Sequence, residues 1–309
     1  MDNNQYIDTG NKPAALDVEN RADGTIILSC PYPLPEPKQS TAHLFIERAT
    51  EFPDRTLIAE KDDTGEWQHL TYGEALHGTR RVAQWLIDQE GSINAPLAII
   101  SNSSIRHFLM AWGAIIARVP YVPVSYSYST IPGAYPKFRA VLNTVKPKFI
   151  FAENLAPHLD ALSNIDTTGI HLITADKVTE NSKRLPFDST NWQALLDTMP
   201  TADVDNSVDK IDHDTVTRYM FTSGSTGMPK GVIHDHGMSC YQLASGSAVR
   251  NRSGGEKEMK VLDWMPWSHV GAGVMRIANI LEEAGSVYLD TGKPTPEDFH
   301  KTIANLGEV

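Results

Sequence analysis

The amino-acid sequence predicts an α/β fold with largely parallel sheets. From Thr41 to the end of the chain, short apolar runs of strand type alternate with segments whose apolar residues recur at helical spacing. The composition is that of an ordinary globular protein, because 41% of the 309 residues are hydrophobic and 21% are charged. No apolar run reaches the ~18 residues that a membrane-spanning helix needs, and no internal repeat is visible.

Residues 1–40 differ from the rest of the chain. They are polar, and four prolines alternate with other residues between Pro31 and Pro37. Such a segment is expected to form an extended lead-in. The periodic pattern begins at Thr41, so residues 41–309 are expected to form one domain.

A helix is predicted directly after Thr71, because Thr71 and Glu74 have the spacing of a capping box. Further helices are expected from Ser103 or Ser104 through Ile116, at residues 138–145, and around residues 159–162. Strands are expected at residues 97–100, 121–124, 149–152 and 171–174. Pro123 cannot donate a ladder hydrogen bond, so its strand is expected to lie at a sheet edge or to end irregularly.

The second half of the chain continues the alternation after a polar connection. Residues 176–213 are polar and acidic, with one helix expected at residues 192–196. Helices are then predicted at residues 238–248 and 274–281, and strands at residues 260–265 and 286–289. A last helix is expected to start within residues 295–298, with Pro296 at its first helical position.

Charge and cysteine content narrow the class of protein. The net charge of −11 argues against a nucleic-acid partner, since a basic footprint is missing. The two cysteines, Cys30 and Cys240, are too few for a disulfide framework and fit a reducing compartment. The N-terminus lacks the basic and apolar regions of a signal peptide, so a cytoplasmic location without a membrane span is expected.

The most informative segment is rich in glycine and hydroxyl groups and lies between two strand-like runs. Its residues are Thr222, Ser223, Gly224, Ser225, Thr226 and Gly227, followed by Pro229, Lys230 and Gly231. Glycines let the backbone approach a ligand and adopt positive φ, while hydroxyls, backbone N–H groups and one ammonium satisfy an anion. The segment therefore predicts a turn between two strands that wraps a polyphosphate.

Two other interpretations of this segment fit less well. A Walker-type phosphate loop would have glycine in place of Pro229 and Ser or Thr in place of Gly231. A flexible Ser/Gly linker would not be flanked by the apolar runs at residues 218–221 and 232–233.

A second candidate segment spans residues 263–273 and follows a predicted strand. Ligands in open α/β sheets collect at the carboxyl ends of strands, which makes His269 a candidate site residue. Trp264, Met265 and Trp267 either line a pocket or pack in the core, and core packing is favoured for each tryptophan. His234 and His236 are two apart, but no third ligand stands nearby, so no metal site is predicted and His236 is expected to cap or pack.

The stretch from Thr222 to Gly231 resembles the phosphate loop of the adenylate-forming superfamily. This group includes acyl-CoA and aryl-CoA synthetases, luciferases and the adenylation domains of peptide synthetases. Residues 45–55, 70–74 and 113–124 resemble other segments of these enzymes, so the resemblance covers residues 41–309. It implies the fold of their N-terminal domain, with stacked βα layers. Residues 123–129 and 149–152 are most similar to feruloyl-CoA synthetase-like members.

The resemblance implies a ligase that works in two steps. A small carboxylic acid, aromatic in feruloyl-like members, attacks the α-phosphorus of ATP, and a thiol, usually of coenzyme A, then displaces AMP. ATP, Mg²⁺ and coenzyme A are the implied cofactors. Thr222, Ser223, Ser225 and Thr226 would donate to the phosphates, while Gly224 and Gly227 permit the wrap. Lys230 would offset the charge of the departing pyrophosphate, and His269 would line the acyl pocket beside the reacting carboxylate.

Two later motifs of this superfamily are absent from the sequence. There is no Tyr-Gly-x-Thr-Glu segment, whose glutamate holds magnesium, and no Tyr-x-Thr-Gly-Asp segment, whose aspartate binds ribose. The small mobile C-terminal domain is also absent. We therefore expect an incomplete N-terminal part of a longer enzyme, with little activity without its C-terminal part. A peptide-synthetase adenylation domain, which loads a carrier protein, and a nucleotide-binding remnant without catalysis remain open.

Overall fold

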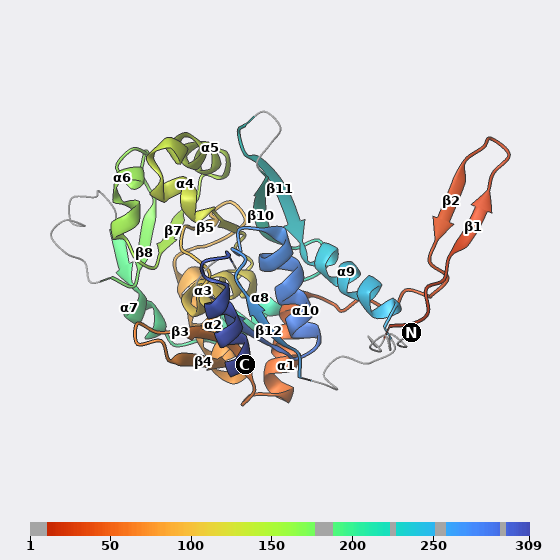
Figure 1. The fold of residues 1–309 in the computed structure, drawn as a ribbon. Helices are drawn as coiled ribbons and strands as arrows, with labels where there is room; N and C mark the ends of the chain where they lie inside the picture. Colours follow the sequence, from red (N-terminus) through yellow and green to blue (C-terminus); the bar gives the residue numbers. More distant parts are fainter. Residues whose placement is uncertain (1–10, 177–187, 223–226, 251–257, 291–294) are drawn as a thin grey trace.

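The computed structural model describes residues 11–176, 188–222, 227–250, 258–290 and 295–309. Two sheets, each mainly parallel, are packed with helices, and a separate two-stranded hairpin projects from the body (Figure 1). This arrangement confirms the predicted α/β class, because strands and helices alternate along most of the chain.

The larger sheet has seven strands in the order β11-β10-β6-β5-β7-β8-β9. Each neighbouring pair is parallel except β10 and β11, which form an antiparallel hairpin at one edge. The strands are β5 (Leu97–Ile99), β6 (Tyr121–Pro123), β7 (Phe149–Ala152), β8 (His171–Thr174), β9 (Asp188–Asn191), β10 (Val216–Thr222) and β11 (Lys230–Asp235).

The smaller sheet has four strands in the order β12-β13-β3-β4. β12, β13 and β3 are parallel, whereas β4 runs antiparallel to β3. The strands are β12 (Lys260–Asp263), β13 (Ser286–Leu289), β3 (Thr56–Lys61) and β4 (Trp67–Thr71).

The helices begin largely where the sequence provides caps. Glu74 N donates to Thr71 Oγ1 at 3.2 Å and Thr71 N donates to Glu74 Oε2 at 2.9 Å, which confirms the capping box. Ser104, rather than Ser103, caps α3. The helices are α1 (Thr41–Glu51), α2 (Tyr72–Asp88), α3 (Ile105–Ile116), α4 (Tyr126–Thr130), α5 (Tyr135–Val145), α6 (Leu159–Leu162), α7 (Trp192–Leu196), α8 (Ala202–Val208), α9 (His236–Ala248), α10 (Ile277–Glu282) and α11 (Phe299–Glu308), with short η1 (Pro132–Ala134), η2 (Ala156–His158) and the π-helical η4 (Gly271–Arg276).

Two apolar cores hold the layers together. The larger core joins both sheets, because side chains of α2 and α3, such as Leu86 and Phe108, pack between strand residues such as Ile58 and Phe151. The smaller core lies on the other face of the seven-stranded sheet, under α5 and α6, and contains Phe138 and Leu162.

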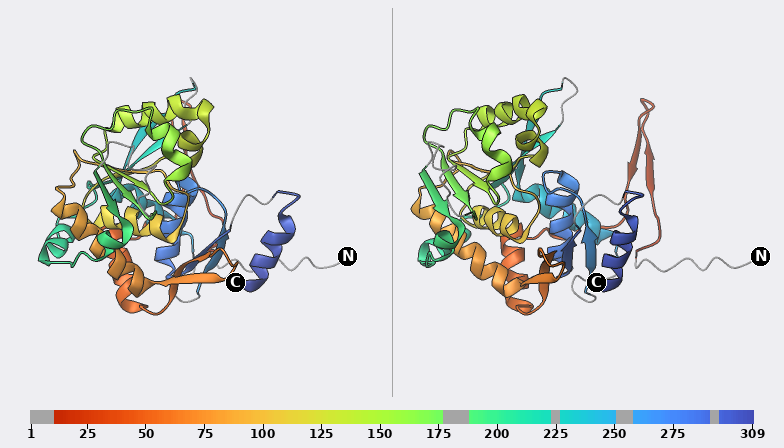
Figure 2. Two further views of the ribbon diagram at one scale, coloured as in Figure 1. Left: turned by 90° about the vertical axis from the view of Figure 1, so that its left-hand side faces the viewer. Right: turned by 60° about the vertical axis from the view of Figure 1, so that its left-hand side comes forward.

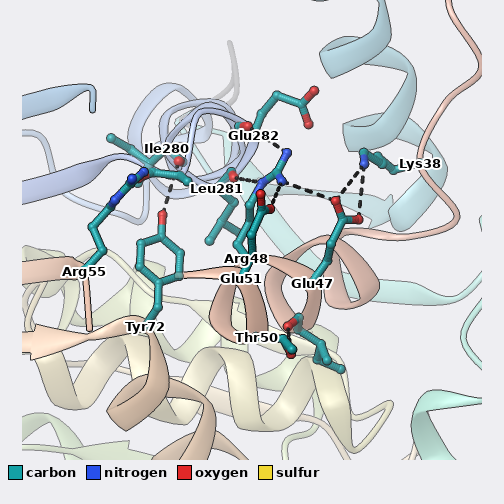
Figure 3. Close-up of polar contacts among 12 residues, drawn as sticks. Lys38, Glu47, Arg48, Thr50, Glu51, Arg55, Tyr72, Ile280, Leu281 and Glu282 are labelled. Carbon is teal, nitrogen blue, oxygen red and sulfur yellow. Dashed lines mark hydrogen bonds and ion pairs between the residues drawn. The ribbon is translucent and has the colours of Figure 1, made fainter. Parts of the chain in front are cut away.

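A polar junction ties α1 to the end of α10 (Figure 3). Buried Arg48 donates to the carbonyl oxygens of Leu281 at 3.3 Å and Glu282 at 3.2 Å, and it pairs with Glu51 at 2.8 Å. Tyr72 OH donates to Gly285 O at 2.8 Å, and burial raises the pKa of this phenol. Carbonyls at a helix end have no intrahelical partner, and Arg48 supplies a donor to that of Glu282.

Three sequence-based expectations need correction. β6 is an interior strand, so Pro123 does not mark a sheet edge; it is the last residue of β6 and pairs in register with Ile99. The last helix begins at Phe299, because residues 295–298 form a turn in which Asp298 N donates to Thr295 O at 3.1 Å. Pro296 therefore precedes the helix. The polar connection also contains an unpredicted strand, β9, and an unpredicted helix, α8.

The lead-in contains an antiparallel hairpin of β1 (Asp17–Asn20) and β2 (Ile26–Ser29), which stands away from the body (Figures 1 and 2). Cys30 is exposed, Cys240 is buried, and both thiols are free. Within the described ranges, every helix is too short or too polar to cross a lipid bilayer.

Candidate functional site

The phosphate-loop candidate lies at the tip of the β10–β11 hairpin. Register partners run from Val216 with Asp235 to Thr222 with Lys230, so the polar segment joins two antiparallel strands. A Walker loop would lead into a helix instead. The two strands predicted on either side of the segment are therefore confirmed, and the Walker alternative does not fit.

The structure places part of the predicted phosphate-binding set. Thr222 ends β10, Lys230 begins β11, and both are exposed. Gly227 has φ +84°, a conformation that favours glycine. The remaining predicted residues, Ser223, Gly224, Ser225 and Thr226, lie outside the described residues.

The hairpin has two chemically different faces. Paired residues of an antiparallel ladder share a face, so Thr222 with Lys230 and Arg218 with His234 lie on one side. Tyr219 and Phe221 lie on the other side, where a pocket of about 400 Å³ runs beside β11. Lys230, which is exposed near the tip, and Arg218, which is buried near the base, thus lie on the same face.

The second motif forms a turn between β12 and η4. His269 is exposed; its N–H donates to Pro266 O at 2.9 Å and its carbonyl accepts from Gly273 N at 2.8 Å. Trp267 is buried, and its N–H donates to Ser103 Oγ at 3.1 Å, whereas Trp264 is 38% exposed. Core packing is thus confirmed for Trp267 and wrong for Trp264.

Arg218 connects the two motifs and was missed in the sequence. Its Nη1 donates to Gly273 O at 2.8 Å, which brings β10 against the turn that contains His269. The signal was a charged residue inside an otherwise apolar strand run, followed by Tyr219, Met220 and Phe221. Arg218 is only 3% exposed, whereas charged side chains are almost never fully buried unless they are paired.

The two histidines after the loop do not share a strand face. β11 ends at Asp235, and His236 is the first residue of α9, whose N-cap is Asp235. His236 packs in the interior, with Nδ1 2.8 Å from Thr41 Oγ1. Burial, with the nearby Arg218 charge as the second cause, lowers the pKa of His236 to about 3. The packing alternative is therefore confirmed for His236, while the cap belongs to Asp235.

The magnesium ion implied by the resemblance has no evident ligand set in the described part of the chain. No three His, Cys, Asp or Glu side chains gather there in a way that would hold a metal ion. The side chain of Asp263 instead pairs with Arg276 at 3.1 Å.

The fold is that of an α/β protein in which a hydroxyl-rich sequence segment joins two antiparallel strands, close to a turn that follows another strand. The sequence pattern of the family described as "AMP-binding enzyme" matches residues 45–307. The chain belongs to this family of AMP-binding enzymes.

The known relatives include both a peptide synthetase and a CoA ligase. Nonribosomal peptide synthetase 30 of Fusarium vanettenii is 25% identical over 64% of this chain and 3% of its own length. Long-chain-fatty-acid–CoA ligase ACSBG2 of Xenopus laevis is 22% identical over 82% of this chain and 34% of its own length. The chain thus spans well under half of either relative.

A solved structure confirms the fold. The N-terminal domain of FACL13 from Mycobacterium tuberculosis superimposes with a TM-score of 0.63 at 17% identity, over 86% of this chain and 60% of that one. At this identity the likeness establishes the architecture, namely that of an N-terminal domain of adenylate-forming enzymes.

Proposed function

We propose that this chain binds the phosphates of ATP as part of an enzyme. The enzyme activates a carboxylic acid as its adenylate and then transfers the acyl group to coenzyme A. In the first step a carboxylate oxygen bonds to the α-phosphorus and pyrophosphate leaves. In the second step a thiol sulfur bonds to the acyl carbon, AMP leaves, and the thiol proton passes to solvent. The proposal rests on membership of the family and on the hairpin tip.

The observation that supports it most directly is the pairing of Thr222 with Lys230 at the base of the loop. Both reactants are anions, so the site must provide donors and positive charge without blocking the ligand. Lys230 is exposed and forms no ion pair with any described residue. Its ammonium is therefore available for a phosphate group.

The remaining roles complete the same proposal. Thr222, Ser223, Ser225 and Thr226 donate hydroxyls to the β- and γ-phosphates, and Gly224 with Gly227 allows the backbone to close around them. Lys230 neutralises the departing pyrophosphate, and His269 lines the pocket for the acid. An aromatic acid, as in feruloyl-CoA synthetase-like members, belongs to this proposal as one candidate substrate.

Pyrophosphate exchange tests the proposal. The full-length natural protein is incubated with ATP, Mg²⁺, labelled pyrophosphate and, in separate reactions, fatty, hydroxycinnamic, amino and keto acids. We expect label to enter ATP with one class of acid, and Lys230→Ala to abolish most of that signal. The proposal would be contradicted if no acid supported exchange, or if the Lys230→Ala variant showed full exchange.

A second candidate function differs only in the acceptor. Peptide synthetases are among the relatives, which favours an adenylation domain that loads a carrier protein. The two candidate functions are distinguished by adding an acceptor after adenylate formation. Coenzyme A should release AMP rapidly from a CoA ligase, and a carrier protein bearing a pantetheine thiol should do so from an adenylation domain. A nucleotide-binding remnant would bind ATP and show neither reaction.

A further inference from the structure

Arg218 is a buried cation that forms no ion pair with any residue the structure describes. Its side chain is 3% exposed, and no carboxylate in the described ranges forms an ion pair with it. Its contacts are neutral: Gly273 O at 2.8 Å, Thr217 Oγ1 at 3.3 Å and the ring of Tyr121, 5.2 Å from the ring centroid. Burying a charge with only neutral partners costs free energy that packing alone would not justify.

The hydrogen-bond partner of Arg218, Gly273, lies in η4, directly after the turn that contains His269. Gly273 N donates to His269 O at 2.8 Å, and a methyl group on Gly273 would overlap the Trp267 carbonyl. Asp263, at the end of β12, and Arg276, at the end of η4, form an ion pair at 3.1 Å that lacks hydrogen-bond geometry. A contact that holds Gly273 in place therefore also holds the backbone of His269 in place.

The other end of Arg218 belongs to the strand that leads into the phosphate loop. Arg218, Met220 and Thr222 alternate along β10, so their side chains lie on one face, together with Lys230. Arg218 is thus a rigid link between the hairpin that would hold the nucleotide and the turn that would face the acid.

We propose that Arg218 is a positioning residue that holds the His269 turn in register with the phosphate loop. This inference rests on the proposed function, because the register matters only if the two motifs bind the two reactants. Arg218 itself contacts neither reactant. Its loss should weaken use of the acid while leaving the binding of ATP at the hairpin tip nearly unchanged.

Arg48 provides a matched control. It is also buried, at 8% exposure, and it also donates to main-chain carbonyls, those of Leu281 and Glu282. It differs in joining α1 to α10 (Figure 3) and in pairing with Glu51 at 2.8 Å. Arg48→Met therefore reports the general effect of removing a buried arginine that binds carbonyls.

Amide hydrogen exchange on the 309-residue chain tests the link itself. In Arg218→Met we expect amides of residues 265–273 to exchange about tenfold faster, and those of β11 to change less than about twofold, since local opening follows the lost hydrogen bond. Arg48→Met should accelerate residues 277–285 instead. Unchanged exchange at residues 265–273 in Arg218→Met would overturn the inference.

Kinetics on the full-length natural protein test the consequence. With the acid that supports pyrophosphate exchange, Arg218→Met should raise KM for the acid about tenfold and change KM for ATP less than about twofold, because one charged hydrogen bond is lost on the acid side only. Arg218→Lys, which keeps a cation but not the planar fork, should fall in between. Equal KM values for the acid in Arg218→Met and Arg48→Met would overturn the inference.

Failure of the proposed function and failure of the positioning role of Arg218 are distinguishable. A wild-type protein that supports no exchange with any acid refutes the proposed function, whatever the hydrogen-exchange result. A wild-type protein that is active, with Arg218→Met behaving as Arg48→Met in both experiments, refutes only the positioning role.

Discussion

Thr222 and Lys230 are register partners at the last paired position of the β10–β11 hairpin. Residues directly opposite in an antiparallel pair have Cβ atoms about 5 Å apart and project to the same face. A hydroxyl and an ammonium are therefore presented together at the point where the glycine-rich segment leaves the sheet. The same face holds Arg218 further down the strand, so Arg218 and Lys230 lie on one side of the hairpin.

Removing the ammonium should weaken nucleotide binding selectively. We expect Lys230→Gln to raise the Kd of ATP by about ten- to a hundredfold, since a hydrogen bond to a charged group is worth about 1.5–3 kcal/mol. Isothermal titration of ATP into the purified protein measures this. The control is Lys210→Gln, which makes the same change at an exposed lysine on α8's C-terminal side. Equal Kd values for the two variants would contradict the assignment of Lys230.

The capping box of α2 should contribute measurably to folding. Thr71→Ala removes the acceptor of the Glu74 N–H, and we expect it to lower the free energy of unfolding by about 1 kcal/mol. Thr144→Ala is the control, because Thr144 is exposed within α5 and only bonds back to Ala140 O at 2.7 Å. Urea denaturation should show no loss, or a slight gain, for the control. A similar loss in both would show that the cap has no special effect.

Local signals in the sequence predicted most of the fold correctly. The capping box at Thr71, the apolar runs of the inner strands and the helical spacing after Ser104 each correspond to an observed element. These signals are local, because a cap or an alternation is visible within a few residues. β9 was missed because its residues, Asp188–Asn191, are polar and gain their place only by pairing with β8 at a sheet edge.

The candidate site was predictable in its motifs but not in its connections. The hydroxyls, glycines and lysine of the loop are contiguous, so their composition indicated a phosphate site directly. The contact between Arg218 and Gly273 spans 55 residues and depends on how β10 meets η4. Likewise, the burial of His236 depends on Thr41, 195 residues away. Such pairings arise from tertiary packing, which a single sequence does not show.

Buried histidines should make stability depend on pH. The pKa of His236 falls from 6.5 to about 3 on folding, mainly through burial. Between these values the unfolded chain binds a proton that the folded chain does not, so stability is lost as pH falls from 6.5 towards 3. The pKa values of His107 and His158 fall to about 4, mainly through burial, and act in the same direction.

The variant His236→Asn isolates one of these contributions. Asparagine keeps an acceptor for the Thr41 N–H but has no proton to gain, so the slope of unfolding free energy against pH should decrease by up to about 1.4 kcal/mol per pH unit. Denaturation at several pH values between 4 and 6.5 measures the slope. A variant that is less stable at every pH with an unchanged slope would show that His236 does not titrate on unfolding.

Gly273 should tolerate no side chain, because its Cα lies against the backbone of Trp267. A Cβ there would overlap the Trp267 carbonyl oxygen, and backbone cannot move aside as a flexible side chain does. We expect Gly273→Ala to lower the free energy of unfolding by at least about 2 kcal/mol, as overpacking does in well-packed interiors. Gly307→Ala is the matched control, since nothing lies within 4 Å of its Cβ and it is helical. Alanine favours helix there, so we expect a gain of up to about 0.5–1 kcal/mol. Thermal and urea unfolding of both variants measure the difference, and a Gly273→Ala protein as stable as Gly307→Ala would show that the turn around His269 is looser than its contacts indicate.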